Sequence, residues 1–411
     1  MTVTPYKFEL SSTDSSLDFS SLDQKQYARV VIEDEIDYLF PYMEVHLNDV
    51  AGILVEGMIS GEGLSFTSAL GSNEEGYDGW IYGNWMLRNV NTNDIRVDGH
   101  FGGMIGIGFQ HDYKGNDVPK TRAWNDTISN IVKNVLEVDY QLTDPEKIFI
   151  TRTEGKKIRY QNGINNKEFI DSLLKRAYSS TYEYSPFVSF INIMEEFYFC
   201  TIEDLFNIGT RVDEKPFIFK ADVGSSYDKY TFKKVDNIFI QGLTTNKQNY
   251  KKNIHKFKYT ATAEPFELET TEIENHLLNN DTEGRLLINS NLPNITGKYF
   301  SKESYGLYNL DNDFEDYKGY RNSFYKENLF NFQLTGIVPF HPKVASGRIM
   351  NLEVESVLPD KGGYSREYSG EWLITKNKVF YDFDGMPFNA ITIGKNYVIP
   401  DATYALLNQV I

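Results

Sequence analysis

The glycine-rich stretch Gly99–Gly108 (GHFGGMIGIG) is the segment whose residue types most directly suggest a ligand site. Glycines hold a phosphate when their backbone amides lie at the start of a helix, as in dinucleotide-binding motifs. This stretch does not open a helix, and no Gly-Lys followed by Ser or Thr ends it. We therefore interpret it as a glycine-bent strand of a β-barrel and predict no cofactor there.

A second candidate is an acidic loop with the spacing of a calcium site. Asp311, Asp313 and Glu315 resemble the start of an EF-hand loop. That loop needs a glycine next and a bidentate glutamate seven residues after Glu315, whereas this chain has Asp316 and Asn322. We predict a solvated acidic loop without bound calcium.

The histidines give no pattern of metal ligands. They are His46, His100, His111, His255, His276 and His341. None belongs to a His-x-His or His-Glu-x-x-His motif, and only His100, His111 and Asp112 could meet across a hairpin. Zinc sites are built from closely spaced His and Cys ligands, so we predict no metal site.

Nucleophilic catalysis has no recognisable motif in this sequence. Cys200 is the only cysteine and lies in the apolar run Phe197–Ile202, which is typical of a buried, unreactive thiol. There is no Gly-x-Ser-x-Gly elbow. The many Asp and Glu residues leave open a pair of catalytic carboxylates of the glycosidase type. A surplus of acidic residues, however, usually lies on the solvated surface. We predict that the chain is not an enzyme, and we assign no catalytic, cofactor-binding or metal-binding residue.

Composition restricts the class of protein further. The 411 residues carry a formal charge of −17, and 15% of them are aromatic, including 28 Tyr and 28 Phe. Disordered chains have few aromatic residues, and generic nucleic-acid binders are basic, so both classes are excluded. No apolar run is long enough to span a membrane, and the polar N-terminus is not a signal peptide, so we expect a cytoplasmic start.

Hydrophobic periodicity indicates how the chain is organised. We expect a flexible N-terminal arm at residues 1–23 and a first β-barrel at 24–116, where alternating segments are separated by glycines. Residues 117–230 read as an α+β domain, with helical spacing from Ile128 to Leu136 and a cap at Asp126 or Thr127. Residues 231–411 read as a second β-barrel with a loop-rich insertion at about 262–330.

Several segments, taken in order, resemble the baseplate hub proteins of tailed phages. These segments are Val31–Asp34, Leu39–Val45, the turn Asn48–Leu54, Lys120–Val132, Phe169–Tyr178, Asn331–Gly336, Gly347–Ile349 and the closing strand Tyr368–Thr375 (YSGEWLIT). The resemblance covers about residues 27–396, and its ordered spacing carries more weight than any one motif. Residues 245–330 match none of the family's motifs.

The resemblance implies two similar β-barrels joined by α+β domains, with three subunits forming a pseudo-six-fold ring. It implies that the ring adapts a six-fold tail tube to a three-fold central spike, as in the related type VI secretion spike and late control proteins. Partners would be the spike, the tube protein, the tape-measure protein and baseplate wedge or other neighbouring tail proteins. DNA would pass through the channel without specific binding, in a virion assembled in the host cytoplasm.

Two other functions remain open on the sequence. The chain could be another tail or baseplate assembly protein, such as a tube initiator or wedge component, without a second barrel. It could also be a tail-associated cell-wall hydrolase, although residues 245–330 are rich in Asn and lack a catalytic signature.

Overall fold

The computed structural model describes about half of the chain. The described residues are 6–12, 27–49, 65–73, 79–93, 96–97, 100–101, 103–111, 118–182, 185–208, 212, 217–219, 238–239, 241–247, 319, 322, 332–354, 369–382 and 386–395. Apart from Gly319 and Asn322, the expected loop-rich insertion at about 262–330 lies outside them, and the EF-hand-like loop is part of that insertion.

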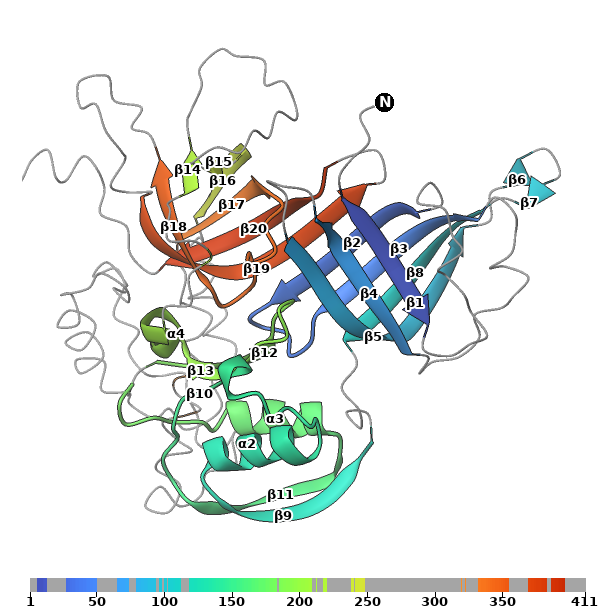
Figure 1. Cartoon of the computed structure of the whole chain (residues 1–411). Helices are drawn as coiled ribbons and strands as arrows, with labels where there is room; N and C mark the ends of the chain where they lie inside the picture. The colour runs from blue at the N-terminus through green and yellow to red at the C-terminus, as the bar shows by residue number, and fades with distance from the viewer. Residues whose placement is uncertain are drawn as a thin grey trace, which may run out of the picture.

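An N-terminal strand group is built from six antiparallel strands in the spatial order β1-β4-β5-β8-β3-β2 (Figure 1). The bounds are β1 Lys7–Ser12, β2 Tyr27–Glu35, β3 Tyr42–Asp49, β4 Ser65–Ser72, β5 Gly79–Asn93 and β8 Gly103–His111. A separate pair is formed by β6 Arg96–Val97 and β7 His100–Phe101.

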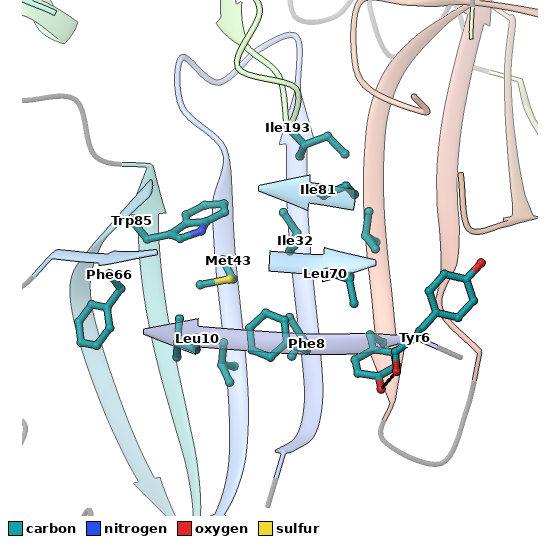
Figure 2. Packing of buried hydrophobic residues seen from close by; sticks show 14 of the residues in the cluster. Tyr6, Phe8, Leu10, Ile32, Met43, Phe66, Leu70, Ile81, Trp85 and Ile193 are labelled. Atoms are coloured by element: carbon teal, nitrogen blue, oxygen red, sulfur yellow. Dashed lines mark hydrogen bonds between the residues drawn. The ribbon is translucent and has the colours of Figure 1, made fainter. Parts of the chain in front are cut away.

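Alternation along these strands creates one apolar core. Every second residue of β2 and β3 points inward, and the inward residues that are buried include Val30, Ile32, Met43 and Val45. Figure 2 shows Ile32 and Met43 facing Phe8, which comes from a strand that crosses over theirs. The indole nitrogen of Trp85 donates to Ser68 Oγ at 2.8 Å, which satisfies the one polar atom of this ring.

The first strand corrects one expectation. Residues 1–23 were predicted to form a flexible arm, but Lys7–Ser12 forms β1 and pairs with β4 over its whole length. Phe8 and Leu10 are buried while Lys7 and Glu9 are exposed. This short alternating pattern is hidden in the sequence because Ser and Asp dominate the residues that follow it.

A C-terminal strand group has its own core. Its strands are β14 Phe217–Phe219, β15 Ile238–Phe239, β16 Gln241–Lys247, β17 Phe332–Pro339, β18 Ile349–Val354, β19 Gly370–Asp382 and β20 Phe388–Lys395. Strands β16 to β20 pair antiparallel with their neighbours, and β14 pairs parallel with β15 and β18. Trp372, Met350 and Ile393 lie in the core between them.

The two strand groups share one continuous sheet. Strand β2 of the N-terminal group pairs antiparallel with β19 of the C-terminal group, from Lys376 opposite Glu35 to Asp382 opposite Arg29. The result is a mixed, β-rich sheet of 13 strands in which the two strand groups lie side by side (Figure 1). Each group has its own cluster of buried apolar residues. We call the paired strands β2 and β19 the seam.

A central α+β unit lies below the sheet in Figure 1. Its elements are β9 Lys120–Asp126, α2 Ile128–Val138, the 3-10 turn η3 Pro145–Lys147, β10 Ile148–Ile150, β11 Lys157–Ile164, α3 Asn166–Leu174, β12 Phe187–Ile191, β13 Phe197–Thr201 and α4 Ile202–Ile208. The expected helix over 128–136 is confirmed, and Thr127 is its cap. A capping box between Asn165 and Glu168 starts α3.

Candidate functional site: a buried polar junction

A network of buried polar side chains lies where the two strand groups meet the central α+β unit. Asp34 on β2 is its centre, with 2% of its surface exposed. Strand alternation explains why an aspartate is inside, because Asp34 follows Val30 and Ile32 on the inward face. We call this network the polar junction.

The Asp34 carboxylate joins three parts of the chain. Oδ2 accepts the backbone N–H of Ile193 at 3.2 Å, from the loop between β12 and β13, and that of Ser346 at 2.9 Å, just before β18. Oδ1 accepts Nδ2 of Asn377 on β19 at 3.0 Å. Ser346 Oγ also donates to the Asp34 carbonyl at 2.9 Å. One side chain therefore fixes the α+β unit and both strand groups relative to each other.

A relay of amides extends the junction into β20. The backbone N–H of His341 donates to Asn389 Oδ1, Asn389 Nδ2 donates to Asn377 Oδ1, and both distances are 2.9 Å. Asn377 then donates to Asp34, as above. A backbone N–H can only donate, so the N–H of His341 fixes the orientation of Asn389 and, through it, of Asn377.

A buried ion pair forms the second half of the junction. The Arg348 guanidinium forms a bidentate pair with Glu196, and both side chains are less than a tenth exposed. Tyr198 Oη at 2.9 Å and Asn192 Nδ2 at 2.7 Å donate to the same carboxylate. Burial by itself would raise the pKa of Glu196, but the hydrogen bond and charge of Arg348 hold it below its usual value.

Asp34 has no cation beside it among the groups that set its titration. Burial raises the pKa of Asp34 to about 7, against the opposing effect of the donors from Ser346, Asn377 and Ile193. The carboxyl group therefore titrates near neutral pH, unlike an exposed aspartate.

A glycine allows the junction loop to pass close to the α+β unit. Gly347 lies between Ser346 and Arg348 with φ +83°, in the left-handed region. A Cβ at this position would lie 2.4 Å from the ring of Phe190. A larger residue at this position would have to displace the buried ring of Phe190 and would be strained at this positive φ.

The arrangement holds segments of the chain together. Its carboxylates accept hydrogen bonds on both oxygens, and its amides are paired. Within the described residues, no group of three His, Cys, Asp or Glu side chains could hold a metal ion. We therefore interpret the junction as an architectural site.

Apart from the backbone N–H of His341 at the end of the relay, the described residues that the sequence singled out lie outside the junction. Cys200 is buried on β13, its thiol donates to the Phe149 carbonyl at 3.1 Å, and burial raises its pKa to about 12. The glycine-rich stretch is confirmed as strand from Gly103 onward, because β8 pairs with β3 and β5. On the outer face of β3, His46 Nε2 lies 3.1 Å from Glu44 Oε1.

The other histidines do not form a site that the structure describes. His100 and His111 are in strands, but their side chains are outside the description, and so are His255, His276 and Asp112 altogether. The sequence did contain a signal for Asp34, because the alternation that places Val30 and Ile32 on the inward face of β2 also places Asp34 there. Its partners could not be found this way, because Ser346 and Asn377 are more than 300 residues away.

Comparisons with known proteins give matches only at the level of structure. No family model and no curated protein matches the chain. A 43 kDa tail protein of prophage MuSo2 from Shewanella oneidensis is 9% identical, with 95% of this chain and 98% of that one aligned at a TM-score of 0.48. A tail protein from Neisseria meningitidis is 8% identical, with 96% of this chain and 98% of that one aligned at a TM-score of 0.47.

A third similar structure is an Escherichia coli component of the type VI secretion system, itself described as similar to tail proteins of bacteriophage T4. It is 10% identical, with 96% of this chain and 79% of that one aligned at a TM-score of 0.46. The structures that resemble this chain thus include phage tail proteins and secretion-spike components. With TM-scores below 0.5, the likeness by itself assigns no function. No helix among the described residues is long and apolar enough to cross a membrane.

Proposed function

We propose that this chain is a structural hub protein of a phage tail baseplate. Three copies form a ring that adapts the six-fold tail tube to a three-fold central spike. The ordered sequence motifs described above suggest this role, and the arrangement of the strands supports it.

The observation that carries the proposal is the seam. Residues Arg29–Glu35 of β2 pair with Lys376–Asp382 of β19, so one chain holds two strand groups, each with its own apolar core, side by side in one sheet. Three such chains present six strand groups around an axis. A ring of this kind meets a six-fold partner on one side while keeping three-fold symmetry for a spike on the other.

Each strand group is proposed to form a β-barrel. In the C-terminal group, Ile238–Phe239 pairs with β14 and Gln241–Lys247 pairs with β17, so one segment connects both ends of the path β14-β18-β19-β20-β17. In the N-terminal group, Tyr381 Oη on β19 donates to the Tyr6 carbonyl at 3.1 Å, which brings the seam to the start of β1. Closure of both groups would remove exposed sheet edges.

The partners follow from this position in the tail. The hub contacts the tube protein, the central spike, the tape-measure protein and baseplate wedge or neighbouring proteins, in a virion tail assembled in the host cytoplasm. DNA leaves through the central channel without specific binding. The net charge of −17 supports free passage, because an acidic lumen repels the phosphate backbone.

The proposal includes no catalysis. The only thiol is buried and has a raised pKa, which disfavours a thiolate nucleophile. The role depends instead on holding two strand groups and the α+β unit in one rigid arrangement.

Native mass spectrometry of the purified chain, together with sedimentation at tens of micromolar protein, tests the assembly. We expect a trimer of the 47.4 kDa chain. A chain that remains monomeric or dimeric at these concentrations contradicts the proposed ring.

A further inference from the structure

The relay of the polar junction runs from the interior to a turn that water can reach. Asp34, Asn377 and Asn389 are each at most 2% exposed. His341, whose backbone N–H begins the relay, lies partly exposed in the turn between β17 and β18. A polar group that loses its partner is costly at the three buried positions, whereas at His341 it can be hydrated.

The carboxylate form of Asp34 fits the relay as it stands, because every hydrogen bond points toward the carboxylate. The N–H of His341 donates to Asn389, Asn389 donates to Asn377, and Asn377 Nδ2 donates to Asp34 Oδ1. The other carboxylate oxygen, Oδ2, accepts two backbone N–H groups, which can never become acceptors. A side-chain amide can, because its oxygen and nitrogen change places when it rotates. Only Oδ1 therefore faces a group that can accept a proton in a hydrogen bond.

We propose that this relay is a proton-sensitive switch, which reverses when the Asp34 carboxylate takes up a proton from water on Oδ1. The new O–H donates to Asn377, whose amide rotates to present its oxygen. Asn377 then donates to Asn389, which rotates in the same way and turns its nitrogen toward the N–H of His341. Two donors meet there, so the N–H of His341 leaves the relay and binds water.

The switch acts on the turn between β17 and β18, because the junction holds this turn at both ends. The N–H of His341 bonds to Asn389 at its start, and the N–H of Ser346 bonds to Asp34 Oδ2 at its end. Reversal of the relay releases the start and leaves the end in place. The turn is thus held twice by the carboxylate form and once by the protonated form. This inference goes beyond the proposed function, since it needs only one copy of the chain.

The charged groups on the strands around Asp34 point to the opposite face of the sheet, as strand alternation requires. The outer faces of β2, β3 and β19 carry Glu33, Glu35, Glu44, His46, Lys376 and Lys378, which form ion pairs there. The two loops that bond to Asp34 contribute Glu195, which lies 3.6 Å from Lys147, and the pair of Glu196 with Arg348, to which Tyr198 donates. Burial raises the pKa of Asp34 to about 7, so proton uptake takes place near neutral pH.

The turn itself adds Lys343 and the imidazole of His341. The Nδ1 atom of this imidazole accepts the backbone N–H of Lys343 at 3.2 Å. Because an imidazole also titrates near neutral pH, the test must separate it from Asp34.

Hydrogen exchange of the His341 amide tests the switch, measured by mass spectrometry on the full chain between about pH 5 and about pH 8 and corrected for the intrinsic exchange rate. Protection of this amide should be ~10-fold lower at the acidic end, the value of one hydrogen bond. The Ser346 amide should keep its protection, because its bond to Oδ2 remains. Equal protection of His341 across this range in the wild type overturns the switch.

Asp34→Asn should fix the reversed relay, since its amide nitrogen donates to Asn377 as the protonated carboxyl group would. We expect low protection of His341 at every pH. Asp382→Asn is the matched control, because it makes the same substitution on the outer face of the seam, where Asp382 pairs with Arg29. It should keep the wild-type dependence on pH.

His341→Gln removes the imidazole and keeps the backbone N–H, so the dependence of protection on pH should persist in this variant. Its disappearance would assign the effect to the imidazole and overturn the switch, as would its persistence in Asp34→Asn. If Asp34→Asn does not fold, the result with His341→Gln decides between the two groups.

Discussion

The two faces of the seam hold polar side chains in opposite ways. On the inner face, Asp34 and Asn377 are buried and held by hydrogen bonds. Asp34 accepts from Asn377 Nδ2, and Asn377 Oδ1 accepts from Asn389 Nδ2. On the outer face, Lys376 contacts Glu35 at 2.6 Å and Lys378 contacts Glu33 at 2.6 Å, with a fifth to a third of each side chain exposed. Successive residues of a strand point to opposite faces, so the buried pair Asn377–Asp34 and the exposed pair Lys378–Glu33 are direct neighbours along the same two strands.

The difference shows which face specifies the arrangement of the molecule. A buried group that loses its partner keeps the full cost of its lost hydration, whereas an exposed ion pair exchanges its partner for water. The inner face therefore tolerates one geometry. The outer face adds solubility and a small, salt-dependent attraction across the seam.

The largest effect should come from breaking the buried ion pair. Glu196→Ala leaves the Arg348 guanidinium buried without its carboxylate, so we expect a loss of about 3–5 kcal/mol in the free energy of unfolding, measured by urea denaturation. Replacing both residues, Glu196→Leu with Arg348→Met, should restore much of that loss. A double variant that is as unstable as Glu196→Ala would show that the pair itself, and not the unpaired charge, matters.

A smaller effect concerns the titration of Asp34. Its pKa is about 7 in the folded chain and 3.8 as an ordinary aspartate, so the folded state binds more protons between these values. Stability should therefore fall as pH rises from about 4 to about 7, by up to about 1.4 kcal/mol per pH unit from this group, and then level off.

Asp34→Asn isolates this contribution. In this variant the free energy of unfolding should no longer fall between pH 5 and 7, whatever its absolute value, since the substituted amide does not titrate in this range. The lowered pKa of Glu196 acts at lower pH and with the opposite sign, because its contribution is lost as pH falls. An unchanged dependence of stability on pH in Asp34→Asn would contradict the assignment of this titration to the buried Asp34 carboxyl group.

The smallest effect should come from the outer face. Arg29 Nε donates to Asp382 at 2.7 Å across the seam, with about half of each side chain exposed. Asp382→Asn should cost less than about 1 kcal/mol, and the cost should shrink at high salt. A loss as large as that of Glu196→Ala would remove the distinction between the two faces.

Local pattern predicted a good part of this fold. The spacing of Ile128, Ile131 and Val135 predicted α2, but the sequence left its cap open between Asp126 and Thr127. Alternation identified β2 and β3, and the first half of β19 was predicted from the family resemblance at Tyr368–Thr375. The strand β1 was missed because its six residues adjoin a polar stretch.

The junction could not be predicted from the same patterns. Asp34 is visible as an inward aspartate, but its partners come from three distant loops and strands, which only the folded sheet brings together. The exposure of Tyr160 was equally hidden, because a half-apolar strand does not reveal whether its second face is covered.

A reconstruction of the assembled tail is the most direct test of the hub. We expect three copies of this chain around the tail axis, with six strand groups forming one ring between the tube and the spike. Six copies of the chain in that ring, or a position at the periphery of the baseplate, would contradict it.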